Sequence, residues 1–423
     1  MAKIAVIGTG IAGNVAAYHL AKEHEITVYE ANDYIGGHTH THEINHDGET
    51  HSVDTGFIVF NHKTYPNFIH LLEELGVEYQ HSDMSFSVSC ERTGLEYNGT
   101  TLNTLFAQRR NFFKPSFYRM IKDILRFNKD SAELLAAEQK DVLLGDYLAA
   151  NDYSQQFIEH YIIPMGSAIW SMSRAQMMAF PAQFFVRFFT NHGMLSVDDR
   201  PQWYVIKGGS KSYLDALCQS YLDKIRLNQA VTSIKRTDDG VIVSTDDTEE
   251  TYDYVFNACH SNQAFAQLQT PNKIEQETLG VMHYQPNDVV LHTDKSLMPK
   301  RKLAWAAWNY HLLQEESSQA TLTYNMNILQ SLKSKNTFCV TVNNSAAVDS
   351  DTIIKKLDYD HPLFTSESVA AQLRHREVNG SDRVYYCGAY WRFGFHEDGV
   401  VSALAAVNHF YEDIGREQQT ILR

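Results

Sequence analysis

The sequence predicts an α/β fold in which two domains are interleaved along one chain. The first observation is a glycine-punctuated strand–turn–helix pattern at the N-terminus, "KIAVIGTGIAGNVAAYHLAKE". The second is a glycine pair before a helix in "WYVIKGGSKSYLDALC", and the third is a strand, loop and long helix in "DRVYYCGAYWRFGFHEDGVVSALAAVNHFYEDI". Stretches of different texture separate these three, and 423 residues suffice for two domains with substantial cores.

The N-terminal stretch has the pattern of a Rossmann-like dinucleotide-binding unit. "KIAVIG" reads as a short buried parallel strand, and Gly8, Gly10 and Gly13 follow it as GxGxxG before a helix. A second strand, "EITVYE", ends in Glu30. In this context the motif is specific, because the three glycines permit the tight turn, the close approach of a pyrophosphate and the packing of the helix on the strand.

The same unit predicts which groups would hold an adenine dinucleotide. The helix N-terminus, with Ile11 and Ala12, would hold the phosphates, and Glu30, followed by Ala31, would accept hydrogen bonds from the adenosine ribose. The alternative is that the glycines only form turns. The motif alone leaves open whether the dinucleotide is FAD or NAD.

The residues after Glu30 resemble the flavin-containing amine oxidase and phytoene desaturase superfamily. "EANDYIGGHTHT" matches its E-x-x-x-x-x-G-G pattern, in which the double glycine, here Gly36 and Gly37, passes beside the pyrophosphate and the ribityl chain. His38 and Thr39 occupy the two positions after it. The resemblance implies FAD and not NAD, and we expect it to be bound noncovalently.

The resemblance also implies cofactor contacts elsewhere. "VDTGFIVFN" resembles the segment that brings a glycine to the flavin end, a later strand uses its backbone to bind the adenine, and the last strand ends in a glycine; the residues concerned are Thr55, Gly56, Phe57, Val231 and Gly388. In the final motif of the family a helix N-terminus points at the flavin ring, where its dipole would stabilise negative charge on the reduced flavin. We expect that helix to begin at Asp398, Gly399 and Val400.

A closer resemblance is to a bacterial branch of predicted NAD/FAD-binding proteins, often encoded beside cyclopropane-fatty-acid-synthase-like enzymes. It rests on "VDTGFIVFNHKTYPNF", "GSAIWSMS", "LMPKRKLAWAAWNY" and "YYCGAYWRFGFHEDG". Where amine oxidases place an aromatic-cage tyrosine this sequence has His396, and where many have an acid it has Ala389. Tyr390, Trp391, Trp305 and Trp308 could replace the cage, although the sequence does not bring them together.

His396, together with Glu397, is the best candidate for a catalytic group. A histidine can act as acid or base near neutral pH, and alignment with the family places His396 at the flavin. The alternative is that His396 only hydrogen-bonds the cofactor.

The domain boundaries follow from changes in motifs and in the pattern of apolar residues along the chain. Residues 1–64, 203–262 and 380–423 are assigned to the FAD-binding domain, and residues 65–202 and 263–379 to an α+β substrate domain. The second set includes an aromatic and Met-rich stretch at 161–193, which predicts a helical core, an apolar substrate cavity, or both. The segment "DYDHPLFTSESVAAQL" predicts a helix with Pro362 near its start.

Three functions are compatible with these motifs. The first is an FAD oxidoreductase that removes a hydride from a C–H of an apolar substrate, a lipid acyl chain above all, as a desaturase or dehydrogenase. The second is a flavin amine oxidase acting on a primary or secondary amine. The third is a non-catalytic lipid carrier with a flavoprotein fold, which the intact dinucleotide motif argues against.

Composition limits the partners and the compartment. The net charge of −15 argues against nucleic acid or an anionic membrane surface as the main partner. The basic clusters at 109–110 and 300–302 could still meet an anion, although a solvated face is the interpretation we favour for each. No stretch has the length of a transmembrane helix, which leaves room for transient membrane contact only. The five scattered cysteines predict a cytoplasmic location. Substrate identity, electron acceptor and oligomeric state are not encoded in these patterns.

Alternating histidines after the glycine pair suggest a metal site when they are taken alone. His38, His40 and His42 would lie on one face of an extended chain. The spacing from Glu30 instead assigns His38 to the cofactor, and His40 and His42 to a strand leading away from it. We therefore expect no metal.

Overall fold

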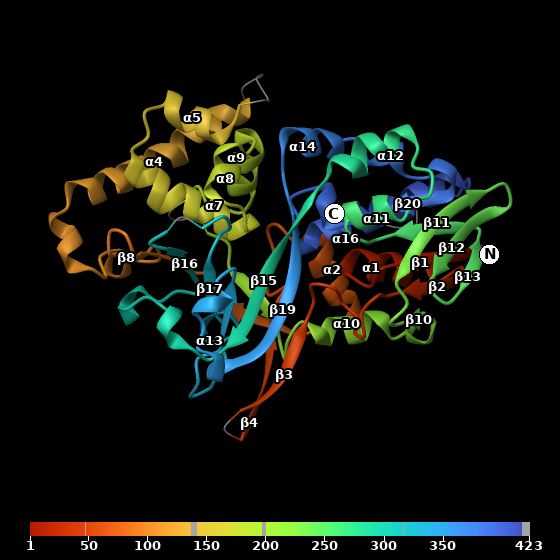
Figure 1. Cartoon of the computed structure of the whole chain (residues 1–423), viewed down its shortest axis with the longest axis horizontal. Helices are drawn as coiled ribbons and strands as arrows, with labels where there is room; N and C mark the ends of the chain where they lie inside the picture. The colour runs from red at the N-terminus through yellow and green to blue at the C-terminus, as the bar shows by residue number, and fades with distance from the viewer. Residues whose placement is uncertain (47, 137–141, 197–199, 316, 417–423) are drawn as a thin grey trace.

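The fold was analysed in a computed structural model, which describes residues 1–46, 48–136, 142–196, 200–315 and 317–416. Two lobes lie side by side, and the long strands β15 (Tyr284–His292) and β19 (Ile353–Pro362) run between them (Figure 1). Both the N-terminal strand and the C-terminal helix belong to the same lobe (Figure 1). The α/β fold class with interleaved segments is confirmed.

The first lobe contains a five-stranded parallel sheet in the order β10-β2-β1-β14-β20. These strands are Ile225–Arg226, Glu25–Tyr29, Lys3–Ile7, Tyr254–Asn257 and Val384–Tyr386. Their central residues are apolar and buried because helices or strands cover both faces. On one face pack α1 (Ile11–Leu20), α2 (Pro66–Leu75), α10 (Lys211–Cys218) and α16 (His396–Asp413).

The other face of the parallel sheet is covered by a small antiparallel sheet and by short helices. The sheet consists of β11 (Val231–Thr237), β12 (Gly240–Thr245) and β13 (Glu249–Tyr252). The helices are α11 (Ser261–Ala266), α12 (Lys273–Thr278), α14 (Ser366–Gln372) and α15 (His375–Val378). Together they bury the apolar side of β1 and β14 in a second core.

The second lobe is built on a seven-stranded sheet in the order β19-β15-β18-β17-β16-β7-β8. Its five shorter strands are β18 (Cys339–Val342), β17 (Leu322–Asn325), β16 (Trp308–Leu312), β7 (Phe86–Cys90) and β8 (Leu95–Asn98). Only the β16–β7 pair of this sheet is parallel. An aromatic core joins the sheet to α4 (Pro115–Ala136), α5 (Leu144–Ala150), α6 (Gln155–Phe157), α7 (Ile163–Trp170), α8 (Arg174–Met178) and α9 (Ala182–Asn191).

Two small sheets lie near the junction of the lobes. One is the hairpin of β3 (Thr41–His46) and β4 (Glu49–Asp54), and the other joins β5 (Val59–Asn61), β9 (Trp203–Ile206) and β6 (Tyr79–Ser82). Asp54 is fully buried and accepts hydrogen bonds from the Ser210 amide and hydroxyl, from Thr41 and from Gln330. This carboxylate therefore ties the hairpin to α10 and to the second lobe.

The five-stranded and seven-stranded sheets draw their strands from different segments of the chain. Every strand of the parallel sheet lies within residues 1–64, 203–262 or 380–423, and every strand of the seven-stranded sheet lies within 65–202 or 263–379. Three helical segments expected in the substrate domain, at 66–75, 273–278 and 366–378, nevertheless pack on the parallel sheet.

The helix expected over residues 358–373 was wrong in its first half. Residues up to Pro362 continue β19, which pairs with β15 along its length and ends at the pair Tyr284–Pro362. The strand is favoured over the helix because it pairs with β15 along its length, and Pro362 lies at the strand end, where a missing amide costs little. The helix begins only at Ser366, after a capping box of Thr365 and Ser368.

Among the described residues, none of the helices combines the length and the apolar character needed to cross a bilayer.

Candidate functional site

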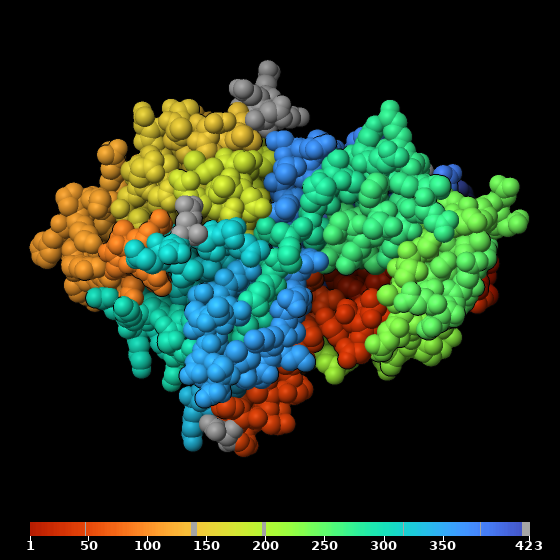
Figure 2. Space-filling view, viewed as in Figure 1, coloured from red at the N-terminus to blue at the C-terminus, as the bar shows by residue number. Residues whose placement is uncertain are grey.

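A large cavity of about 870 Å³ lies where the two lobes meet. Its lining includes the residues that follow β1, β2, β14 and β20, at the carboxyl edge of the parallel sheet, where such sheets bind ligands. The space-filling view shows the molecule hollowed between the central strands and the green β11–β13 region, with red N-terminal residues at the floor (Figure 2). The volume falls within the range of small-molecule and cofactor sites.

The glycine turn has the geometry expected of a phosphate-binding loop. Gly8 has φ +95°, and its amide donates to the carbonyl of Tyr29 at 2.8 Å. A Cβ on Gly13 would lie 1.9 Å from the carbonyl oxygen of Gly8, whereas a Cβ on Gly10 would meet nothing within 4 Å. Gly13 is therefore needed for packing of α1 on the turn, and Gly10 leaves open space at the N-terminus of that helix.

The double glycine lies directly on this turn. Gly37 has φ +58°, and a Cβ added there would come within 3.2 Å of the Cα of Gly10. Gly36 has φ +130°, and its amide donates to the Thr9 hydroxyl. The left-handed backbone at both positions favours glycine, so the loop is shaped by its sequence to pass beside the helix N-terminus.

Glu30 lines the cavity, and its carboxylate accepts hydrogen bonds from two neighbouring residues, Thr9 and Asn32. One carboxylate oxygen accepts from the amide and hydroxyl of Thr9 at 2.9 and 2.5 Å, and the other accepts from the amide and side chain of Asn32 at 2.9 and 2.8 Å. A ribose hydroxyl would have to replace one of the two side-chain donors. The sequence did not indicate these partners.

Three histidines from distant segments meet in the cavity wall. The ring centroids of His38 and His260 lie 5.6 Å apart, and those of His38 and His361 lie 5.7 Å apart. Burial lowers the pKa of all three, to about 3 for His260 and His361, so the imidazoles are neutral. Among the described residues, Nε2 of His38 and Nδ1 of His260 have no hydrogen-bond partner, although both atoms are buried.

His396, the first residue of α16, lies in the same cavity and is held by a hydrogen bond and a ring stack. Its Nε2 hydrogen-bonds the Tyr213 hydroxyl at 2.7 Å, and Tyr213 in turn bonds the Thr39 hydroxyl at 2.6 Å. The ring stacks on Phe57 with centroids 3.6 Å apart. Burial holds the pKa of His396 well below 6.5, so it is a neutral imidazole.

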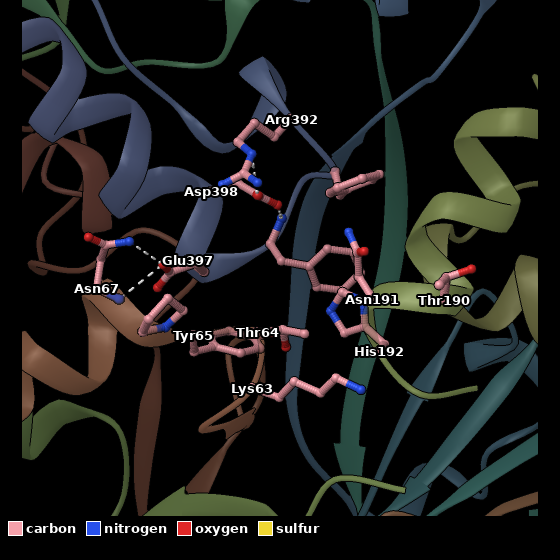
Figure 3. Close-up of a pocket in the computed structure, with 13 residues that line it drawn as sticks. Lys63, Thr64, Tyr65, Asn67, Thr190, Asn191, His192, Arg392, Glu397 and Asp398 are labelled. Carbon is pink, nitrogen blue, oxygen red and sulfur yellow. Dashed lines mark hydrogen bonds and ion pairs between the residues drawn. The ribbon is translucent and has the colours of Figure 1, made fainter. Parts of the chain in front are cut away.

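Glu397 does not line this cavity, which goes against a role for it in proton transfer. Its carboxylate accepts from the amides of Asn67 and Phe68 at 3.0 and 2.9 Å and from the Asn67 side chain. It thereby satisfies the free amides at the start of α2. Figure 3 shows it facing Asn67 in an adjoining polar pocket of about 460 Å³.

Asp398 lies in that adjoining pocket as well, beside Arg392 (Figure 3). It accepts from the Phe395 amide at 2.9 Å and forms an ion pair with Arg392 at 3.6 Å. Burial raises the pKa of Asp398 to about 7. Its backbone is in the first turn of α16, which begins at His396, two residues before the predicted start.

The remaining candidates divide between the cavity wall and the packing behind it. The cavity is lined by Gly8, Gly10, Ile11, Ala12, Ala31, Thr39, Gly56, Phe57, Val231 and Gly388. Gly13, Thr55, Gly399 and Val400 lie outside the lining. Thr55 bonds Tyr359 at 2.8 Å, and a Cβ on Gly399 would meet Ile11 at 2.6 Å, so α16 packs closely on α1 there.

The part of the cavity wall beside the aromatic core of the second lobe is apolar, whereas β19 of the same lobe adds Asp358, Asp360 and His361 to another part of the wall. The lining of the apolar part is aromatic or aliphatic, with Met84, Ile169, Trp170, Phe188, Met194, Trp308, Tyr324, Phe393 and Phe395. Of the four aromatic residues proposed to replace an amine cage, Tyr390 and Trp308 line the cavity, while Trp305 and Trp391 do not. For Ile169, Trp170 and Phe188 the sequence predicted a helical core, an apolar cavity or both, and it could not show which side chains border the cavity.

The structure adds residues that the sequence did not single out. His260, Tyr359 and His361 join the wall from the segment after β14 and from β19. Tyr359 and His361 alternate along β19, and this pattern was missed in the sequence because a helix was expected over 358–373. His40 and His42 are accounted for by a ring stack of His40 on Tyr34 and a hydrogen bond between His42 and Thr55. The described part of the chain contains no group of His, Cys, Asp or Glu arranged to hold a metal ion.

The residues present fit a flavin dinucleotide. The open glycine turn, the double glycine with positive φ and the start of α1, which has no side-chain cap, provide a phosphate site. Buried polar atoms of His38, His260, Gln229, Trp308 and Tyr390 lack partners among the described residues. Such atoms are costly unless a ligand pairs with them.

Comparisons with known proteins agree with this geometry. Residues 11–342 match the family model described as flavin containing amine oxidoreductase. A 55-residue stretch is 44% identical to the flavin-dependent L-tryptophan oxidase RebO of Lentzea aerocolonigenes, and this match covers 13% of the chain and 12% of that oxidase.

Solved structures of similar fold cover nearly the whole chain. Cyclohexylamine oxidase from Brevibacterium oxydans IH-35A has a TM-score of 0.69 at 16% identity, with 98% of this chain and 100% of that chain covered. A fatty acid isomerase from P. acnes that produces CLA also has a TM-score of 0.69 at 16% identity, covering 97% and 99%. Putrescine oxidase bound to putrescine has a TM-score of 0.68 at 15% identity, covering 98% and 99%.

At these identities the structural likeness establishes the fold, whereas the family model, which matches most of the chain, establishes the family. The expectation of FAD, and not NAD, is confirmed by that family. The chain belongs to the flavin containing amine oxidoreductases, and it is a flavin-dependent enzyme whose cofactor is FAD.

Proposed function

We propose that the chain is an FAD-dependent oxidoreductase that removes a hydride from a C–H of an apolar substrate, with a lipid acyl chain as the substrate class. The observation that carries this is the cavity itself, which runs from the glycine turn to a wall of Trp170, Phe188, Phe395 and neighbouring aromatic and Met side chains. Met and aromatic side chains adapt to long, flexible apolar ligands.

We assign the cofactor contacts to two groups of residues. Ile11 and Ala12 at the start of α1, with Gly8, Gly10 and the Gly36–Gly37 loop, would hold the phosphates, and Glu30, Ala31 and Val231 would border the adenosine. His38, Thr39, Gly56, Phe57, Gly388 and His396 would border the ribityl chain and the flavin ring. Gly13, Thr55, Asp398, Gly399 and Val400 would act behind them, by packing and by placing the N-terminus of α16.

The residues of the chain have distinct tasks in the proposed reaction. When bound, FAD supplies a hydride acceptor. The apolar wall excludes water and orients the substrate chain, while Thr39 and Tyr213 hold His396 by a continuous row of hydrogen bonds. A neutral imidazole can take a proton from the substrate, and we assign this role to Nε2 or Nδ1 of His396 and not to Glu397, whose oxygens are used at α2.

We propose that FAD is bound noncovalently and that the protein works in a reducing compartment, the cytoplasm. All five cysteines are free. Cys387 lies outside the cavity lining, and Cys259 lies within it, but burial raises the pKa of Cys259 to about 12 and that of Cys387 further above its usual value. Neither thiol is a nucleophile near neutral pH.

We also place the boundary of the FAD domain more widely than the strands alone require. The proposed division keeps the segments 1–64, 203–262 and 380–423 and adds the helical segments 66–75, 273–278 and 366–378, because their apolar faces pack against the parallel sheet.

An amine oxidase activity is the second candidate. It is favoured by the family and by two carboxylates of β19, Asp358 and Asp360, that line the cavity and would attract a cationic substrate. They lie beside the histidine wall and not among the apolar side chains, which is why we rank this candidate second.

Anaerobic titration of the purified, FAD-loaded protein distinguishes the candidates. We expect acyl lipids to bleach the flavin absorbance and cyclohexylamine, putrescine and L-tryptophan to leave it unchanged. Bleaching by an amine alone would replace the first proposal by the second. A colourless protein that cannot be reconstituted with FAD would contradict both proposals and favour a non-catalytic lipid carrier.

A further inference from the structure

Six of the nine large hydrophobic side chains exposed in the described part of the chain lie on one small region of the second lobe. They are Leu102, Phe112, Phe113, Tyr118, Leu125 and Leu303. Five come from α3 (Leu102–Leu105), η1 (Arg109–Phe113) and the first half of α4, and Leu303 lies in the short helix η6 (Lys302–Ala304). We call α3, η1 and the first half of α4 the α3–η1–α4 surface; their residues, in orange, form the outer edge of that lobe (Figures 1 and 2).

Contacts within the region hold these side chains in one place. Phe106 and Phe112 stack with their ring centroids 4.1 Å apart, and the Tyr118 hydroxyl donates to the carbonyl of Phe112. The guanidinium of Arg109 donates to the carbonyls of Asn103 and Phe106. Phe113 itself remains 88% exposed and Leu102 77% exposed, so the outermost apolar groups project from an ordered base.

Basic residues surround the apolar groups. Residues 97–122 include Arg109, Arg110, Lys114, Arg119 and Lys122 and no acidic residue, in a chain whose net charge is −15. On α4, Tyr118, Lys122, Leu125 and Lys129 follow one another at three- and four-residue spacing and are exposed or nearly so, and therefore share one helix face.

The second basic cluster joins the first in the folded chain. The helix η6 packs beside α3, which places Lys300 and Lys302 next to the α3–η1–α4 surface. The nearby carboxylate of Glu96 is already engaged, because it pairs with Arg301 at 2.9 Å and accepts from the Lys300 amide. The two clusters that read as separate solvated faces in the sequence are thus one cationic region around exposed aromatic side chains.

We propose that the α3–η1–α4 surface docks on an anionic lipid bilayer. Aromatic and leucine side chains on such a surface enter the boundary between headgroups and acyl chains, and lysine and arginine meet the negative headgroups. The overall negative charge does not oppose this, because screening limits the interaction to charges within about 8–10 Å of the membrane. Helix α4 packs on α9, whose Phe188 lines the large cavity, so the docked lobe is the one that carries the apolar wall.

Vesicle binding tests the proposal without any turnover, so its outcome is independent of the proposed function. FAD-loaded protein is sedimented with vesicles of phosphatidylglycerol and phosphatidylcholine, and with phosphatidylcholine alone. We expect binding to the anionic vesicles that weakens with salt. The double variant Phe112→Ser/Phe113→Ser and the double variant Arg109→Gln/Arg110→Gln should each lower the partition coefficient at least about tenfold.

A matched control uses exposed apolar residues of the other lobe. Leu222 and Leu373 are 56% and 86% exposed, and the variant Leu222→Ser/Leu373→Ser should bind vesicles as the parent protein does. Phe113→Trp gives a readout that does not depend on lost binding: its fluorescence should shift to the blue on anionic vesicles and be quenched by brominated lipid.

Other occupants give different results. Absence of vesicle binding, together with a dimer in sedimentation equilibrium that Phe112→Ser/Phe113→Ser dissociates, would overturn the proposal in favour of a second copy of the chain. Binding to nucleic acid that ignores the phenylalanine substitutions, with no binding to vesicles, would overturn it in favour of a purely ionic site.

Discussion

At the scale of single residues, the three glycines of the first motif have separable tasks. A Cβ at Gly13 would collide with the Gly8 carbonyl at 1.9 Å, while a Cβ at Gly10 would point into the open cavity. We expect Gly13→Ala to lower the free energy of unfolding by about 2 kcal/mol and to weaken FAD binding. Gly10→Ala should leave the thermal stability of the FAD-free protein unchanged and still abolish FAD binding, measured by flavin fluorescence. Equal effects of both substitutions would contradict this division.

The proposed proton acceptor gives the second prediction at this scale. His396→Gln should slow flavin reduction by about 10²- to 10⁴-fold, with a much smaller change in the Kd for FAD, because it removes the proposed proton acceptor from the cavity wall. Since burial holds the pKa of His396 well below 6.5, the rate in the parent protein should show no inflection near pH 6.5. A weaker FAD complex with an unchanged reduction rate would reduce His396 to a cofactor contact.

At the scale of elements, α2 depends on a residue from the far end of the chain. Glu397 accepts from the first two amides beyond Pro66. We expect Glu397→Ala to lower the free energy of unfolding by about 1–3 kcal/mol, measured by urea denaturation. Glu397→Gln keeps an acceptor and should recover part of that loss. Flavin reduction in folded Glu397→Gln should remain near the parent rate. A fall in that rate as large as the one expected for His396→Gln would indicate that Glu397 takes part in catalysis.

At the scale of the whole molecule, the buried histidines predict how stability depends on pH. Burial lowers the pKa of His260, His361 and His375 to about 3, so the unfolded chain, whose histidines titrate near 6.5, binds more protons between these values. Stability should therefore fall as the pH falls below about 6.5.

Two buried carboxyls oppose this trend. Burial raises the pKa of Asp54 to about 6 and that of Asp398 to about 7, so the folded state binds their protons more tightly and they favour folding at acid pH. The histidines are more numerous, and we expect the Tm of the FAD-free protein to be lower at pH 5 than at pH 7.5 by differential scanning fluorimetry. A Tm that is flat or higher at pH 5 would show that the carboxyls prevail.

The sequence by itself determined the local parts of this protein. GxGxxG, the acid that ends β2 and the double glycine are short-range patterns whose backbone demands, such as the positive φ of Gly8, Gly36 and Gly37, only glycine meets readily, so they indicated the turn and the dinucleotide before any contact was known. Changes in composition along the chain predicted a division into an FAD-binding domain and a substrate domain, and this division stays a prediction.

Tertiary structure alone decided what depends on contacts between distant segments. Residues 358–362 became a strand because β15 offered a partner, which brought His361 against His38; Glu397 lies one residue after His396 but turns to α2, because consecutive helical residues point about 100° apart. The two basic clusters became neighbours only through the packing of η6 beside α3. Local patterns fix backbone conformation, whereas the faces that meet are set by packing of the whole chain.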